Sequence, residues 1–298
     1  MGMQITTNVS ALNAYRNLSN TQNDLSKSLE KLSSGLRINR AADDAAGLAI
    51  SEGLKSQVSG LNVAARNAQD GISVIQTAEG ALTEVHSILQ RVRDLAVQAG
   101  NDSNNADSRA AITTEAEQLS AELGRITEST NFNGISLLKG DGTEALSFQV
   151  GANGDSSSQI SVTLADMKTA LTGVVTLGYG DLGDPTDATD DVAATATMAV
   201  SFADADTSAA AITAIDAAIT AISTQRSDLG AAQNRFESAI NSLNVSAENL
   251  SAANSRIRDT DMASEMVKFT AANILSQAGT AMLAQANQST QGVLQLLR

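Results

Sequence analysis

The sequence predicts a mainly α-helical protein in which both chain ends form long antiparallel coiled-coil helices, with a small β-hairpin region between them. Apolar side chains step by four and three residues near each end, which is the spacing of a coiled-coil seam. Pro occurs once, at Pro185, so no proline interrupts either terminal pattern. Aromatic residues make up only 2% of the chain, which suits Ala-rich helices that approach closely better than a large globular core. The seams are Leu54, Val58, Leu61, Ala65, Ala68, Ile72 and Ile75, and Phe236, Ile240, Leu243, Ala247, Leu250, Asn254 and Ile257.

Composition narrows the classes of function that the chain can serve. The 298 residues carry a formal net charge of −14, which would repel a phosphate backbone, so we expect no nucleic-acid binding. The absence of cysteine excludes disulfides, thiolate metal sites and cysteine nucleophiles. No stretch approaches the ~20 apolar residues that cross a bilayer, so we expect no membrane span. Residues 1–10 lack the basic and apolar regions of a cleaved signal peptide, which predicts either a cytoplasmic protein or export without such a signal.

The N-terminal part of the chain is predicted to hold two helices. Residues 1–34 have the pattern of an amphipathic helix, and the polar run at 6–8 can cap it. Residues 35–47 begin and end with Gly and are predicted to be a connector. A very long helix is expected from about 48 to 99. Midway along it the apolar seam shifts register, which changes a supercoil without ending the helix. The shifted seam comprises Ala78, Leu82, Val85, Leu89, Val92, Ala96 and Ala99.

Three more helices are expected. Residues 100–107 have the composition of a turn, and a shorter helix is predicted at 108–129. Helical periodicity returns at 208–257 and is followed by a polar connector at 258–261. The last helix is predicted at 262–296.

Between these helices the period of the apolar pattern changes to two. Residues 131–134, with the sequence NFNG, have turn chemistry. Apolar and polar side chains alternate at 146–150 and again at 160–164, on either side of a Gly- and Ser-rich loop, which predicts a β-hairpin. Shorter runs at 174–177 and 198–202 are candidate strands.

The first and last helices carry more apolar surface than one pair of helices can bury. The last helix is apolar over a wide arc, which indicates burial on more than one side. Because few elements remain to cover it, we expect burial against neighbouring copies of the chain; ordinary intramolecular core is the alternative. The candidate interface residues are Leu12, Leu18, Leu25, Leu29, Leu32, Ile274, Leu275, Met282, Leu283, Leu294 and Leu297.

Long blocks at both ends of the chain resemble bacterial flagellin, the subunit of the flagellar filament. Together the similar regions cover roughly residues 3–177 and 207–298. Matches of this length and order at both ends are highly specific. The blocks are LSSGLRINRAADDAAGLAIS (32–51), RNAQDGISVIQTAEGALTE (66–84), QRVRDLAVQAG (90–100), RSDLGAAQNRF (226–236), SRIRDTDMA (255–263) and ILSQAGTAMLAQANQ (274–288).

The resemblance implies a structural subunit that polymerises into a helical tube used for swimming. It implies three parts of the chain. Residues 1–44 and 256–298 would form a discontinuous inner-tube helical domain, residues 45–177 and 207–255 a rod-like helical domain with the β-hairpin, and residues 178–206 a short variable surface insertion. The alternative within the family is the hook–filament junction adaptor, which starts or ends a filament without polymerising.

The resemblance also implies partners and a location. Besides copies of itself, the chain would meet flagellar cap and junction proteins and a flagellar export chaperone. It would be extracellular, in the filament, after export without a cleaved signal peptide. In a host it would contact the flagellin-sensing Toll-like receptor, and the matching residues are Arg91, Leu95 and Glu115. Read from the residues alone, the same three positions fit a solvated helix face with core beneath it.

Two further carboxylates are candidates for the assembly surface, and no residue is a good candidate for catalysis. We expect the charges of Asp43 and Asp44, in the first connector, to matter for subunit contacts. His86, the only histidine, lies beside the seam of a long helix, and the HExxH motif is absent. The acidic residues within 181–191 lack EF-hand spacing and fit a solvated loop better than a Ca²⁺ site. We therefore expect no enzymatic activity, no cofactor and no metal.

Overall fold

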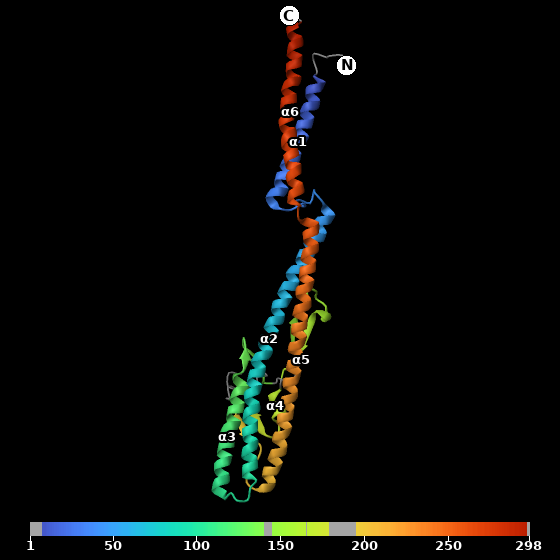
Figure 1. Ribbon diagram of the computed structural model, residues 1–298. Helices are drawn as coiled ribbons and strands as arrows, with labels where there is room; N and C mark the ends of the chain where they lie inside the picture. The colour runs from blue at the N-terminus through green and yellow to red at the C-terminus, as the bar shows by residue number, and fades with distance from the viewer. Residues whose placement is uncertain (1–7, 140–144, 165, 179–194, 297–298) are drawn as a thin grey trace, which may run out of the picture. The chain divides into compact units, whose positions relative to one another are not determined.

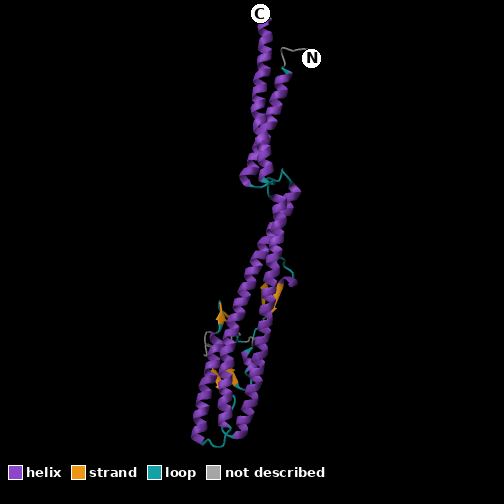
Figure 2. Cartoon of the chain, in the orientation of Figure 1, coloured by secondary structure: helices purple, strands orange, loops and turns teal. Residues whose placement is uncertain are grey.

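A computed structural model describes residues 8–139, 145–164, 166–178 and 195–296 of the chain, with side chains in the last helix described as far as Gln288. Most of these residues are helical and the strands are short (Figures 1 and 2). The helices are α1 (Val9–Ser34), α2 (Ala45–Ala99), α3 (Ala106–Ser129), α4 (Met167–Ala170), α5 (Ala205–Arg258) and α6 (Met262–Leu296). The strands are β1 (Asn131–Phe132), β2 (Ile135–Ser136), β3 (Leu146–Gln149), β4 (Gln159–Val162), β5 (Val175–Gly178) and β6 (Thr195–Met198). The predicted fold class is confirmed.

The chain divides into two compact units. The terminal unit is drawn from residues 1–59 and 247–298, and the central unit from 60–246. The boundaries between the units fall inside α2 and α5 rather than at the two connectors. The three-part division proposed from the sequence, with boundaries at 44/45 and 255/256, stays a prediction.

In the terminal unit, α1 lies antiparallel to α6 and packs along it (Figure 1). Of the three predicted capping residues, the described one, Asn8, caps α1: its Oδ1 accepts a hydrogen bond from the backbone N–H of Ala11 at 3.0 Å. Its Nδ2 donates to the carbonyl of Ala286 in α6, also at 3.0 Å, so the cap ties the two helices together. Gly35 ends α1 in the left-handed conformation, with φ of 72°, where a glycine carries no steric cost.

The two connectors of the terminal unit pair with each other. Leu36 and Asp259 form an isolated antiparallel bridge. On its two sides the N–H of Arg37 donates to the carbonyl of Arg258 at 2.6 Å, and the N–H of Thr260 donates to the carbonyl of Gly35 at 2.9 Å. The segments that the sequence predicts as separate breaks between helices are therefore held together as one joint.

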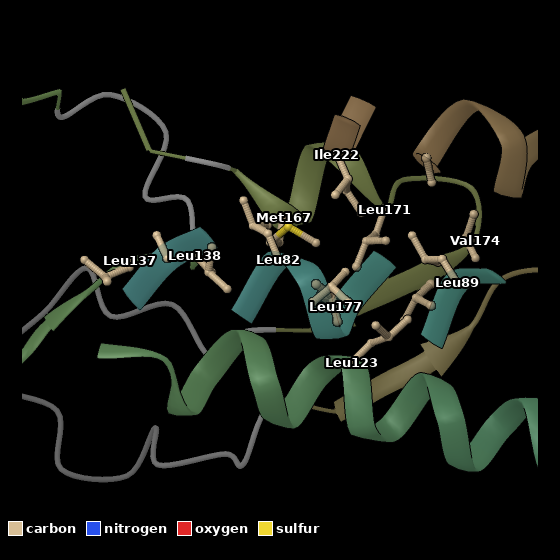
Figure 3. Packing of buried hydrophobic residues seen from close by; sticks show 14 of the residues in the cluster. Leu82, Leu89, Leu123, Leu137, Leu138, Met167, Leu171, Val174, Leu177 and Ile222 are labelled. Carbon is tan, nitrogen blue, oxygen red and sulfur yellow. The ribbon is translucent and has the colours of Figure 1, made fainter. Parts of the chain in front are cut away.

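The core of the central unit is built on the shifted seam of α2. All seven seam residues from Ala78 to Ala99 are at most 1% exposed, so the register shift is confirmed as a change of buried face within one continuous helix. Leu123 of α3 and Ile222 of α5 pack into the same cluster, and so do Met167 and Leu171 at α4 (Figure 3).

The strands form three antiparallel pairs, β1–β2, β3–β4 and β5–β6. The predicted hairpin is confirmed: Phe148 of β3 pairs with Ile160 of β4. Phe148 also meets Phe236 of α5 edge-on, with ring centroids 5.4 Å apart. A Cβ on Gly71 of α2 would lie 3.0 Å from the Phe236 ring, so the glycine lets the aromatic pair approach the helix. The NFNG turn is itself a small hairpin, β1–β2, turned by Asn133 with φ of 52° and the glycine after it.

The two candidate strands at 174–177 and 198–202 are present, but the second lies earlier in the chain than predicted. Val175 of β5 pairs with Met198 of β6, but the strand stops at Met198 instead of continuing to 202. Phe202 lies beyond the strand and is nevertheless 1% exposed in the core. Phe202, within the segment 178–206, therefore belongs to the core of the central unit, and the assignment of that segment as a surface insertion stays a prediction.

Within the described part of the chain, one helix, α5, is long and apolar enough by length and composition alone to cross a membrane. Such a segment also occurs as a core helix of proteins that do not enter membranes. In α5 the apolar residues Ala211, Ile215 and Ile222 are buried in the core of the central unit. The expectation of no membrane span stays a prediction.

Candidate assembly surface

Small and polar side chains bring α1 and α6 close together. Ala272 of α6 is buried, and so are Ser28 of α1 and Glu265 of α6. A Cβ on Gly279 would lie 3.2 Å from a methyl group of Leu18, so the two helices are in tight contact there. Small side chains therefore occupy part of this contact, and many large apolar side chains of both helices stay exposed.

Glu265 is the one charged side chain among the described residues that is classed as buried, at 5% exposed. Its Oε1 accepts a hydrogen bond from the Ser28 hydroxyl at 2.8 Å, and its Oε2 lies 3.1 Å from the Lys268 ammonium. Burial is the largest single influence and raises the pKa of the Glu265 carboxyl. The hydrogen bonds from Ser28 and Lys268, together with the charges of Lys268 and Lys31, more than offset it, so the pKa lies below its ordinary value of 4.5. The charged form is therefore the one that joins α1 to α6.

The remaining apolar side chains of the two helices are exposed. We call the following exposed apolar residues of α1 and α6 the assembly face: Val9, Leu12, Tyr15, Leu29, Met262, Met266, Val267, Ile274, Leu275 and Met282. Each is at least 46% exposed. Isolated exposed apolar residues are normal, but a set this large on one helix pair is typical of an interaction surface.

The assembly face extends around most of α6. Successive residues of a helix are separated by about 100° around its axis. Relative to Glu265, which faces α1, Val267 and Ile274 lie at about 200° and 180°, so both point away from α1. Met266 and Leu275 lie on opposite flanks, at about 100° to one side and 80° to the other. A single neighbouring helix could not bury all four directions.

The predicted interface residues fall into three groups. Leu12, Leu29, Ile274, Leu275 and Met282 belong to the assembly face, at 52–64% exposed. Four others are half-buried, and one of them, Leu18, lies against Gly279 of α6. These four are Leu18, Leu25, Leu32 and Leu283. Leu297 and the side chain of Leu294 lie outside the described residues.

Sequence reasoning left two strongly exposed members out of the interface. Val267, at 70% exposed, lies in the wide apolar arc of the last helix but was not among the predicted interface residues. Tyr15, at 65% exposed, is one of two tyrosines in the chain. Tyr15 lies between the predicted interface residues Leu12 and Leu18, and this position indicates the same surface.

The two predicted carboxylates of the first connector are exposed and bind the backbone of their own loop. Asp43 Oδ2 accepts hydrogen bonds from the N–H groups of Asn39 and Arg40, at 3.2 and 3.0 Å. The bond from Arg40 is the larger cause, and that from Asn39 the next, of an Asp43 pKa below its ordinary value. Asp44 Oδ1 accepts from the N–H of Gly47 at 2.9 Å in the first turn of α2. Both carboxylates therefore stabilise the backbone conformation of the connector and of the start of α2.

The three candidate receptor residues do not share one surface. Arg91 and Glu115 are exposed and face each other across α2 and α3, with Arg91 Nε 2.9 Å from Glu115 Oε1. Leu95 is 1% exposed and belongs to the core beneath them. An exposed ion pair of this kind adds at most about 1 kcal/mol to stability.

The candidate metal-binding and catalytic side chains can be placed only in part. No group of three or more Asp, Glu or His side chains there is placed to hold a metal ion. His86 Nε2 lies 2.9 Å from the amide nitrogen of Gln90, one turn along the same helix. The acidic residues of 181–191 lie outside the described residues.

Comparison with known protein families matches both ends of the chain. The bacterial flagellin N-terminal helical region matches residues 5–143, and the bacterial flagellin C-terminal helical region matches residues 212–297. The second match includes α6, the helix that carries most of the assembly face.

Individual relatives match over nearly the whole length. A flagellin of Halalkalibacterium halodurans is 50% identical over 296 residues, which is 99% of this chain and 100% of that protein. A flagellin of Bacillus subtilis is 50% identical over 317 residues, again 99% of this chain and 100% of that protein. The flagellar filament 33 kDa core protein of Treponema phagedenis is 46% identical over 305 residues, with the same coverage. A crystal structure of Bacillus cereus flagellin is 30% identical, covers 63% of this chain and 94% of that one, and has a TM-score of 0.47.

Proposed function

This chain belongs to the bacterial flagellin family, and we propose that it is a structural subunit of the flagellar filament that polymerises with copies of itself into a helical tube used for swimming. Its full-length relatives include flagellins and a filament core protein, which are structural proteins rather than enzymes. The names of these relatives give no support to the junction adaptor.

The observation that carries the proposal is the assembly face. Ten large apolar side chains of α1 and α6 are about half exposed or more in the single chain. Burial of apolar surface contributes roughly 25 cal/mol per Å². Because this face points in several directions from α6, contact with several neighbouring copies would bury it, as a tube of subunits requires.

In the proposed filament α1 and α6 form the inner tube, and the central unit supplies the rod-like domain. The paired connectors, with Asp43 and Asp44, would lie near the contacts between neighbouring subunits. We propose that these contacts have more than one packing, so that rows of subunits differ in length and the filament becomes helical. A rotary motor would then convert rotation of that helix into thrust.

The location and the remaining partners belong to the same proposal. The subunit would be exported without a cleaved signal peptide, escorted by a flagellar export chaperone, and would fold beneath a flagellar cap beyond the junction proteins. In a host, the exposed Arg91–Glu115 pair would meet the flagellin-sensing Toll-like receptor. Leu95 would support that surface from beneath, because its side chain is buried.

Seeded growth tests the main proposal. Purified protein is mixed with short sonicated filament seeds and ammonium sulfate, and the seeds are measured by electron microscopy. We expect long tubes that grow from the seeds and consist of this chain. If the seeds stay short and the protein is bound only at their ends, the chain acts as a junction adaptor and not as a filament subunit. Protein that never associates with the seeds would overturn assembly altogether.

A further inference from the structure

The described methionines are distributed unequally between the two units. In the central unit Met167 is 0% exposed and Met198 is half-buried. The three methionines of α6 are all in the assembly face: Met262, Met266 and Met282 are 46%, 50% and 64% exposed. A flexible, polarisable thioether adapts to irregular surroundings and is common at surfaces that pack against varied partners. Here the thioethers are open to solvent until such a partner arrives.

An exposed thioether is a site of chemical modification. The sulfur lone pair attacks one oxygen of hydrogen peroxide, an S–O bond forms, the O–O bond breaks, and proton transfer lets the second oxygen leave as water. The methionine loses two electrons to become the sulfoxide, and the peroxide is reduced to water. The chain has no cysteine, so no thiol competes for the oxidant.

The product is poorly suited to the burial that assembly requires. Sulfoxide formation replaces an apolar side chain by a polar one. A polar group buried without a hydrogen-bond partner opposes association. Met266 and Met282 lie on different sides of α6, at about 100° and 260° from Glu265, so oxidation would place polar groups in more than one contact.

We propose that Met262, Met266 and Met282 form an oxidation-sensitive site that controls addition of free subunits to the filament. Peroxide converts them to sulfoxides in the free subunit and blocks addition, whereas burial in the filament protects them. The proposal rests on the proposed function, because it assigns the protection and the block to assembly through the assembly face. Methionine sulfoxide is reducible by methionine sulfoxide reductases, so the block is reversible.

Peptide mapping by mass spectrometry tests the site without reference to growth. Free protein and grown filaments are exposed to hydrogen peroxide, and sulfoxide is measured at each methionine over time. We expect Met266 and Met282 in the free protein to react at least about tenfold faster than buried Met167. Equal reactivity of these positions in the free protein overturns the site. Undiminished reactivity of Met266 and Met282 in filaments overturns the protection.

Seeded growth tests the consequence. Oxidised wild type is expected to elongate seeds at least about tenfold more slowly than untreated wild type, with recovery after reductase treatment. A Met262→Leu/Met266→Leu/Met282→Leu variant, compared with its own untreated sample, should show little slowing, whereas Met167→Leu should be slowed like wild type. Unslowed oxidised wild type, or equal slowing of the triple variant, overturns the control of addition. Failure of untreated wild type to elongate overturns the proposed function instead, and the map of the free protein still decides the site.

Discussion

Replacing two neighbouring residues of the assembly face should weaken polymerisation without unfolding the subunit. Ile274 and Leu275 are 61% and 60% exposed, so about three fifths of each side chain remains to be buried. Complete burial of such a side chain is worth roughly 1.5–3 kcal/mol, which leaves about 1–2 kcal/mol for each and about 2–4 kcal/mol for both. At about 1.4 kcal/mol per factor of ten, an Ile274→Gln/Leu275→Gln variant should need roughly 30- to 700-fold more free subunit to sustain growth. Gln has nearly the helix propensity of Leu, so α6 itself should persist.

The assay is the concentration of free subunit that remains when seeded growth stops. A matched control is Val97→Gln/Val245→Gln, which replaces two side chains of the central unit that are 52% and 58% exposed. We expect the control to stay within about threefold of wild type, because those positions lie outside the assembly face. A residual concentration for the α6 variant within twofold of wild type would refute the assignment, as would an equal effect of the control.

Three further outcomes are expected. Phe236→Ala removes the partner of the Phe148 ring and should lower the free energy of unfolding by about 3–5 kcal/mol, measured by urea denaturation; a loss below about 1 kcal/mol would show that the aromatic contact is not part of the core. The Glu265 pKa is below 4.5, so its carboxylate should stabilise the α1–α6 pair at neutral pH, and this stability should disappear as the pH falls through the lower, folded pKa. Amide hydrogen exchange in α1 and α6 measures this, and Glu265→Gln should remove most of the pH dependence; an unchanged dependence would assign it to other carboxyls. Asp43→Ala/Asp44→Ala should change filament shape and motility, and Asp43→Asn/Asp44→Asn, which keeps acceptor oxygens but not charge, separates charge from loop geometry; normal shape and motility in both variants would contradict a role for these residues in assembly.

The helices and the β3–β4 hairpin could be predicted because their signals are local. A seam such as Leu82, Val85 and Leu89 specifies its buried face through spacing alone, and all three are 0% exposed. Alternation around Phe148 fixed the pairing of its strand in the same way. Helix ends coincided with glycine or with capping side chains such as Asn8, which act on adjacent backbone groups.

The assembly face was predictable in outline and not in detail. Too much apolar surface for one helix pair is a property of composition and periodicity, and from it Ile274 and Leu275 were predicted to meet neighbouring copies. Both are exposed in the structure, and their role in an interface stays a prediction. The α1–α6 contact covers other leucines, such as Leu18 beside Gly279. Which leucines it covers depends on how closely the two helices approach. That distance is set by residues of both helices together.

The sequence by itself determined the helical class of this protein, its family and the surplus of apolar surface at its two ends, since these follow from patterns within single segments. Only the tertiary structure decided that Glu265 is buried against Ser28, 237 residues away, and that Phe202 enters the core beyond the end of its strand. It also decided that the connectors pair through Leu36 and Asp259. The physical reason is the same in each case. The burial of a side chain and the pairing of a backbone group depend on neighbours that the fold brings together, and the spacing of residues along the chain does not specify them.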